Sequence, residues 1–239
     1  GTGRVRPSVA PNVRAVLASL MGAAAVVFAT SVVFFAQNQF RADHWIYGRH
    51  NDSFTPLWVA VAIAALLNAT THPRFARLMA AATAATAAAL IALHILPTGL
   101  SPLRAPVSQY ALTTYSAGYR IATIAAAVAG ASAAAIIATT LTGTAATVAV
   151  ILLAVFALTR LVIGFFPMDA PGTPVTATGR LHNLLAFGAF GSVTAAAFVV
   201  AGAIHDAGDP GLASASTWLG VVMAVGAVAL FVTERVERA

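Results

Sequence analysis

Seven apolar stretches fill most of the 239-residue chain, and each is long enough, or nearly long enough, to cross a lipid bilayer. The hydrocarbon core of a bilayer is about 30 Å thick, which corresponds to roughly 17–25 apolar residues of helix. Because lipid offers no hydrogen bonds, a spanning segment must pair its own backbone groups, and a helix does so within one segment. The sequence therefore predicts an all-α fold, a polytopic transmembrane helical bundle of about seven spans. The predicted spans are 15–36, 54–70 (at the short limit), 75–96, 121–140, 144–166, 184–204 and 213–233.

The composition leaves no room for a separate soluble domain. Charged residues make up 8% of the chain and the mean hydropathy is +0.86, whereas a soluble domain has about 25% charged residues. Once the spans are set aside, only tails and short loops remain. We therefore expect one transmembrane domain over residues 1–239, with a short N-terminal tail at 1–13, in a multi-pass protein of the cell membrane.

Arginine supplies the whole positive charge of the chain. The formal net charge is +6 and the sequence contains no lysine, which, with the great excess of Ala over Ile, is typical of a high-GC bacterial genome. The arginines lie beside predicted helix ends, where they meet lipid headgroups and help to set topology. We therefore expect membrane lipid as a partner and no nucleic acid. The sequence does not identify partner subunits.

Cysteine is absent from the chain. Its absence excludes disulfides, thiolate metal sites and a cysteine nucleophile. Three arginines precede the first apolar run, as in a signal sequence, but that run is longer than the apolar region of a typical signal peptide and no clear cleavage site follows. We expect it to be the first retained helix.

The links between the predicted spans follow a simple alternation of short and long. In a seven-span chain the long links must share one face of the membrane with the C-terminus. The arginine count mildly favours a cytoplasmic position for that face, while the three arginines before the first span favour the opposite, so the orientation stays open. The short links are 72–74, 141–143 and 205–212, and the long links are 37–53, 97–120 and 167–183.

Nearly every reactive side chain falls on or near this long-loop face. A polar loop residue is usually just solvated, but the gathering of so many on one side of an apolar bundle predicts a site there. The candidates are Asp43, His44, Tyr47, His50 and Asp52 in the first long loop, His94, Ser108, Gln109, Tyr110, Tyr115, Tyr119 and Arg120 around the second, and Asp169, Arg180, His182 and Asn183 around the third.

Arg160 is the one charge well inside a predicted span. A charged side chain at the bilayer centre costs about 2.5–3.5 kcal/mol on insertion scales, so it usually faces a partner or a cavity. We expect Asp169 or the first-loop carboxylates to be its partners. The alternative is that Arg160 extends along the helix to the interface, which lies roughly 10 Å away by helical rise.

One alternative for the chemistry of this face is a metal site that uses histidine. His94 and His182, with Asp43, His44, His50 and Asp52, could supply three ligands and a water to zinc. No HExxH or other tight ligand spacing occurs, so we expect no cofactor and keep zinc as the alternative.

Another pair of alternatives uses Asp169. Ser108, His182 and Asp169 could form a nucleophile triad, although no GxSxG elbow is present. Better supported is a carboxylic acid in a desolvated pocket, because burial raises its pKa and lets it donate a proton near neutral pH. Asp169 follows Phe165, Phe166 and Pro167, so we expect it to be that acid, unless it merely caps backbone in a turn.

The stretch from Ser108 to His182 resembles a known family. Ser-Gln-Tyr at 108–110 leads into Tyr-Ser-Ala-Gly at 115–118, one span ends Gly-Phe-Phe-Pro-Met-Asp at 164–169, and the next begins His182-Asn183. This order is similar to the bacterial and archaeal membrane family catalogued as domain of unknown function 998, with a family-like core at about 75–205. Gln109 stands where the family often has an acidic residue. The resemblance implies that Asp169 and His182 are the positions of interest.

The function expected from these patterns is a membrane-embedded enzyme, such as a cyclase or hydrolase, that acts by acid–base chemistry on a lipid or isoprenoid. A lipophilic small molecule would enter the polar face sideways from the bilayer. The alternatives are a non-enzymatic accessory subunit of a membrane complex and a small-molecule or proton-coupled transporter. The expected catalytic residues are Asp169, His182 and Arg160, and the expected substrate-binding residues are Ser108, Tyr110, Tyr115, Phe166, Asn183 and Arg120.

Overall fold

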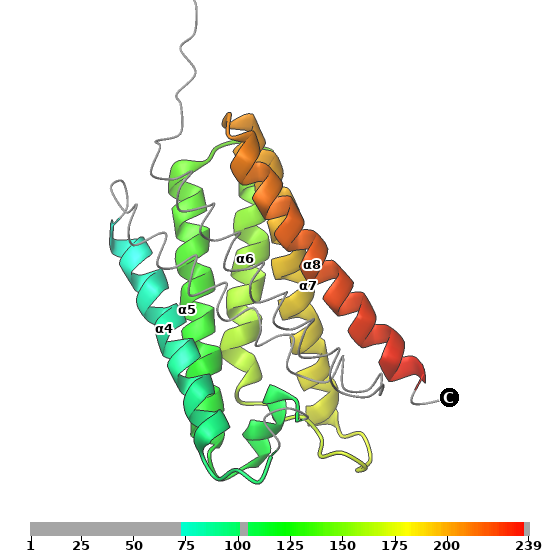
Figure 1. Cartoon of the computed structure of the whole chain (residues 1–239). Coiled ribbons are helices and arrows are strands. Elements are labelled where there is room, and N and C mark those ends of the chain that lie inside the picture. The colour runs from blue at the N-terminus through cyan, green and yellow to red at the C-terminus, as the bar shows by residue number, and fades with distance from the viewer. Residues whose placement is uncertain (1–72, 101–104, 237–239) are drawn as a thin grey trace, which may run out of the picture.

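The computed structural model describes residues 73–100 and 105–236, and this part of the chain is helical without strands. The described residues form five long helices and one short 3₁₀ turn, η2, between the first two, arranged as in Figure 1. The elements are α4 (Pro73–Ile95), η2 (Val107–Leu112), α5 (Ser116–Thr140), α6 (Thr144–Ile163), α7 (Ala177–Asp206) and α8 (Pro210–Val236). The predicted all-α class is confirmed for these residues. The predicted spans 15–36 and 54–70, and the loop between them with Asp43, His44, Tyr47, His50 and Asp52, lie outside them.

Four of the described helices are long and apolar enough to cross a membrane: Arg77–Ile95, Ser116–Thr140, Thr144–Ile163 and Ala177–Asp206. In α8 the shorter stretch Pro210–Val225 is apolar. The chain is thus a helical, membrane-type protein, while the count of seven spans is not confirmed.

Each long helix packs mainly against its neighbour in sequence, from α4 to α8 (Figure 1). The links α5–α6 and α7–α8 lie at one end of the bundle. The link 164–176 and the described parts of the link between α4 and α5, residues 96–100 and 105–115 with η2, lie at the other, which we call the loop end. The parity argument from the sequence is confirmed for these two long links.

Small residues let the helices approach closely. A Cβ added to Gly130 of α5 would lie 2.5 Å from Cδ1 of Phe156 in α6, and one added to Gly118 would lie 2.9 Å from Cδ2 of Leu93 in α4. Ala149 and Ala189 are fully buried. Membrane helices associate through this kind of close van der Waals contact, since lipid provides no hydrophobic force between them.

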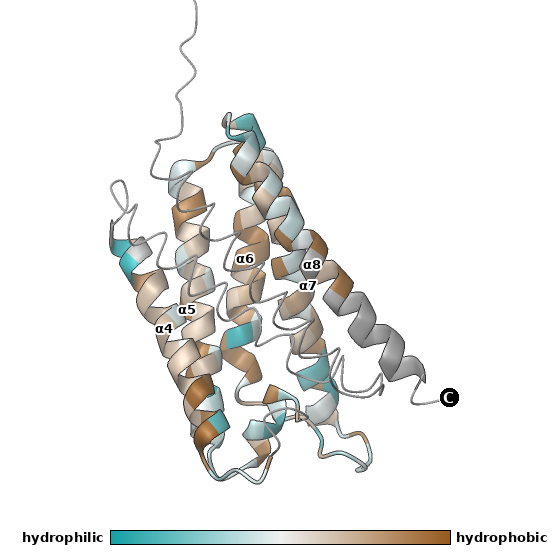
Figure 2. Cartoon of the chain, in the orientation of Figure 1, coloured by the Kyte–Doolittle hydropathy of each residue, from teal (hydrophilic) through white to brown (hydrophobic). Residues whose placement is uncertain are grey.

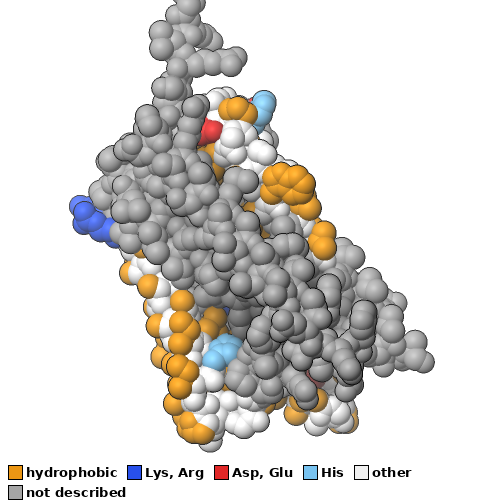
Figure 3. Space-filling view, in the orientation of Figure 1, with side chains coloured by type: hydrophobic (Ala, Val, Ile, Leu, Met, Phe, Trp, Pro, Cys, Tyr) orange, Lys and Arg blue, Asp and Glu red, His pale blue; other side chains and the backbone are white. Residues whose placement is uncertain are grey.

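The outward faces of the helices are apolar. Hydrophobic colours run along the middle of the bundle and polar residues gather at its ends (Figure 2). Figure 3 shows hydrophobic side chains along the length of α4. Large side chains such as Leu184 and Phe187 are mostly exposed, which suits helices that face lipid rather than water.

Several helix ends differ from the prediction, among them the end of α6 and the starts of α7 and α5. α6 ends at Ile163 and not at 166, because Phe165 and Phe166 donate backbone hydrogen bonds to carbonyls three residues back and Pro167 cannot continue a helix. α7 begins at Ala177 and not at 184, because the Thr176 hydroxyl accepts a hydrogen bond from the Gly179 N–H and caps the helix there. α5 begins at Ser116 and not at 121.

Candidate functional site

His182 is the one buried histidine of the described structure, with 4% of its surface exposed. It lies in the second turn of α7, and its Nδ1 is 2.7 Å from the carbonyl oxygen of Phe166. A carbonyl oxygen only accepts hydrogen bonds, so Nδ1 carries the proton. In the neutral ring Nε2 then carries the lone pair, and the orientation of the ring is fixed by the chain at the end of α6.

Arg160 lies in the last turn of α6, close enough for its charge to act on the His182 imidazole. Its Nε is buried and has no hydrogen-bond partner among the described residues. The expected ion pair with Asp169 is not formed, because both oxygens of that carboxylate accept hydrogen bonds from Thr176. The first-loop carboxylates, its other expected partners, lie outside the described part of the chain. The charge of Arg160 thus acts on His182, and the Arg160 Nε has no acceptor in the described part of the chain.

Asp169 organises the start of α7. Its Oδ2 accepts a hydrogen bond from the backbone N–H of Thr176 at 3.0 Å, and its Oδ1 accepts one from the Thr176 hydroxyl at 2.6 Å. That hydroxyl in turn accepts the Gly179 N–H at 3.0 Å. Asp169, Thr176 and the first turn of α7 therefore form one hydrogen-bonded unit.

The expectation that burial raises the pKa of Asp169 is wrong. The hydrogen bonds from the hydroxyl and backbone N–H of Thr176 hold the pKa of this carboxyl below its ordinary value, and the positive charge of Arg180 adds to the effect. A carboxylate that is stabilised in this way does not suit a general acid near neutral pH. The carboxylate instead accepts hydrogen bonds from Thr176 in the turn before α7, which is the alternative that the sequence offered.

Ser108 joins η2 to the loop after α6. Its hydroxyl is 3.0 Å from the sulfur of Met168, and it is partly buried. The alternative triad of Ser108, His182 and Asp169 is contradicted, because His182 Nδ1 pairs with the Phe166 carbonyl and the Asp169 carboxylate with Thr176.

A second cluster at the loop end is aromatic. Tyr110 of η2 is 1% exposed and packs with Leu93 and Tyr119. The ring of His94 lies 5.5 Å from that of Tyr110, and its Nδ1 pairs with the Leu90 carbonyl. His94 thereby packs against η2 and holds it on α4.

An apolar groove of about 500 Å³ runs between α4 and α5. Tyr115 and Thr114 line it near the loop end, and Ala85, Ala88 and Leu93 are among the residues that line it along α4. Of the expected substrate-binding residues, Tyr115 is the one that lines this groove.

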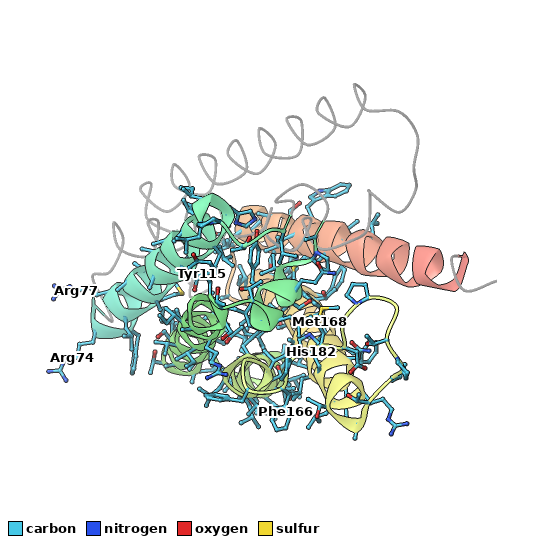
Figure 4. The ribbon with its side chains drawn as sticks, turned by 90° about the horizontal axis from the view of Figure 1, so that it is seen from below. Arg74, Arg77, Tyr115, Phe166, Met168 and His182 are labelled. Carbon is cyan, nitrogen blue, oxygen red and sulfur yellow. The ribbon has the colours of Figure 1, made fainter. Side chains whose placement is uncertain are left out.

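The remaining candidates lie at the margin of the site. Arg120 is exposed, with its guanidinium carbon 5.8 Å from the centre of the Phe165 ring. Asn183 is exposed although it follows His182 directly. In the view from the loop end, Phe166, Met168 and His182 lie in the same quarter of the bundle, whereas Arg74 and Arg77 point away from it (Figure 4). The structure therefore brings Arg160, His182, Phe166 and Asp169 together.

Within residues 73–100 and 105–236, no group of three His, Cys, Asp or Glu side chains could hold a metal ion. The zinc alternative drew four of its ligands from Asp43, His44, His50 and Asp52, which lie outside these residues. Zinc at those positions stays a prediction.

Sequence reasoning missed several polar groups that make hydrogen bonds at helix starts or lie buried in a helix. Thr176 could have been found, since a threonine three residues before a helical N–H is a common N-cap. Asp209 had a similar signal, Asp followed by Pro at the first helical position. It is 7% exposed and its Oδ1 accepts the Leu212 N–H. Thr123, fully buried in α5, carried no sequence signal.

Comparison with known proteins extends the resemblance noted from the sequence. Residues 79–238, more than half of the chain, match the model of the family described as "Protein of unknown function (DUF998)". The match includes the whole site and reaches beyond the expected core end at 205. No curated protein and no solved structure matches the chain. By its sequence and its apolar helices, the chain belongs to the DUF998 family of proteins of unknown function.

Proposed function

We propose that this chain is an integral membrane enzyme that transfers a proton to or from a lipophilic substrate at the loop end, with His182 as the proton-transfer group. The observation that carries the proposal is the pairing of the buried His182 Nδ1 with the Phe166 carbonyl. Histidine is the side chain best suited to give and take protons near neutral pH.

The geometry around His182 supports this role. With the Nδ1 proton committed to a backbone carbonyl, Nε2 is the atom that accepts a proton from the substrate and later returns it. Arg160, which acts electrostatically on the same ring, would stabilise negative charge that develops on the substrate. Asp169 is then a positioning residue, because its bonds to Thr176 fix the first turn of the helix that carries His182.

A lipophilic substrate suits the surroundings of this site. The outward faces of the helices are apolar, and the site lies where a span meets its loop. A lipid or isoprenoid could enter sideways with its chain in the bilayer and its reactive group at the loop end.

The test is the lipid profile of membranes from host cells that express the wild-type chain, His182→Asn or His205→Asn. In His182→Asn the side-chain amide can still donate to the Phe166 carbonyl, but the basic nitrogen is gone. His205 is an exposed histidine of the same helix at its opposite end, so His205→Asn is the matched control.

We expect at least one lipid species to change in abundance with the wild type and with His205→Asn, but not with His182→Asn. The comparison requires that the three variants be present in equal amounts of folded protein, which their helical circular dichroism measures. A wild-type profile equal to that of cells without the protein would contradict the proposal and favour the accessory or transporter alternatives.

A further inference from the structure

We propose that the ligand of this site is an amphiphile with an oxyanion headgroup, a phosphate or a carboxylate, which Arg160 binds. This inference rests on the proposed function, since it names the substrate class of the same site. It starts from the state of Arg160, whose Nε is buried in the last turn of α6 and has no hydrogen-bond partner within the described ranges.

A buried guanidinium donor without an acceptor is costly, because the group has lost water and gained nothing in return. In native proteins such groups are nearly always paired. Among the carboxylates whose side chains the structure describes, Asp169 is bonded to Thr176, and Asp206 and Asp209 lie at the opposite end of the bundle. The acceptor that completes the site is therefore assigned to a bound molecule.

The chemistry of that acceptor follows from the guanidinium. Its planar array of five N–H donors matches two oxygens of a carboxylate or phosphate, and charge-assisted bonds of this kind are about twice as strong as neutral ones. A neutral hydroxyl or carbonyl headgroup would leave the charge uncompensated. The charge of Arg160 also acts on the His182 ring, so an anion that binds the guanidinium would lie within the electrostatic reach of that ring.

The position of Arg160 indicates that the ligand also carries a hydrocarbon chain. The residue is held on an apolar span, one turn before the helix ends. An anion bound there has apolar helix faces next to it, so a ligand with a hydrocarbon chain fills both environments. A free phosphate ion would pair with the guanidinium but would make no use of the apolar helix faces.

The experiment is native mass spectrometry of the full chain in mild detergent, titrated with four probes: dodecyl phosphate, dodecanoate, dodecanol and inorganic phosphate. The same titrations are made on Arg160→Gln and on Arg77→Gln, which removes an exposed arginine far from the site. The readout is the ratio of the dodecyl phosphate or dodecanoate affinity to the dodecanol affinity within each variant. A folding defect lowers both affinities and leaves this ratio unchanged.

We expect the wild type and Arg77→Gln to bind one of the two anionic amphiphiles at least about tenfold more tightly than dodecanol, and Arg160→Gln to lose this preference. The stronger of the two probes identifies the headgroup. An equal ratio in wild type and Arg160→Gln would overturn the inference. Binding of inorganic phosphate as tight as that of dodecyl phosphate would overturn its lipophilic part.

The two proposals fail separately. If Arg160 confers the anion preference but the wild-type chain leaves the lipid profile of host cells unchanged, the site binds without catalysis and the proposed function falls. If His182→Asn abolishes a lipid change while no anionic probe is preferred, the enzyme stands and the oxyanion assignment falls.

Discussion

Asp169 and Gly179 lie so close that a Cβ at position 179 would overlap the Asp169 carboxylate, which would have to move. The carboxylate rests directly on the first turn of α7, where it accepts both hydrogen bonds of Thr176. Negative charge at a helix N-terminus also interacts favourably with the helix dipole. The loop after α6 is thus locked onto the helix that carries His182.

The first prediction follows from this contact. Gly179→Ala should destabilise the protein by about 1–3 kcal/mol, because the new methyl group must displace the Asp169 carboxylate or the loop. Gly191→Ala is the control in the same helix, where a Cβ meets nothing within 4 Å and alanine should stabilise by about 0.5–1 kcal/mol. Denaturation midpoints in detergent, followed by circular dichroism, measure both. Equal effects of the two substitutions would contradict the contact.

The helix cap gives the second prediction. Thr176→Val should lower stability by about 1 kcal/mol, since it removes the hydroxyl that accepts the Gly179 N–H. Thr176→Ser keeps the hydroxyl and should stay near the wild type. The same unfolding measurement compares them, and a serine variant as weak as the valine variant would show that packing, not the cap, is lost.

The third prediction concerns pH. Because the pKa of Asp169 is lower in the folded state than its ordinary value of 3.8, the ionised carboxylate stabilises the fold above that value. This contribution should be lost as pH falls below 3.8 and through the lowered folded pKa. The stability difference between wild type and Asp169→Asn should therefore shrink on acidification. A difference that grows in acid would mean that the folded pKa is raised.

The fourth prediction tests the helix contacts. Gly130→Ala should destabilise the α5–α6 pair, because the added Cβ would lie 2.5 Å from the Phe156 ring. Phe156→Leu in the same chain should recover part of the loss by making room. Thermal unfolding of the two single variants and the double variant measures the coupling. Strict additivity would contradict a direct clash.

The sequence predicted the parts of this structure that lipid imposes. Long apolar runs had to be helices, and alternation of long and short links placed His94, Arg160 and His182 at one end. The details that decide chemistry come from hydrogen bonds between side chains and backbone, which hydropathy does not record. The Thr176 cap moved the start of α7 ahead of His182 and drew Asp169 into a structural role. The Phe166 carbonyl as partner of His182 depends on where α6 ends, and hydropathy placed that end at 166 rather than at Ile163.

The most direct measurement of the central claim uses the purified protein alone. Wild type, His182→Asn and His205→Asn are reconstituted into vesicles made from the total lipid extract of host cells that lack the protein, and lipid masses are followed over time. We predict that wild type and His205→Asn consume a lipid species and form a new one, while His182→Asn forms none. A product formed equally by His182→Asn would show that His182 is not the proton-transfer group.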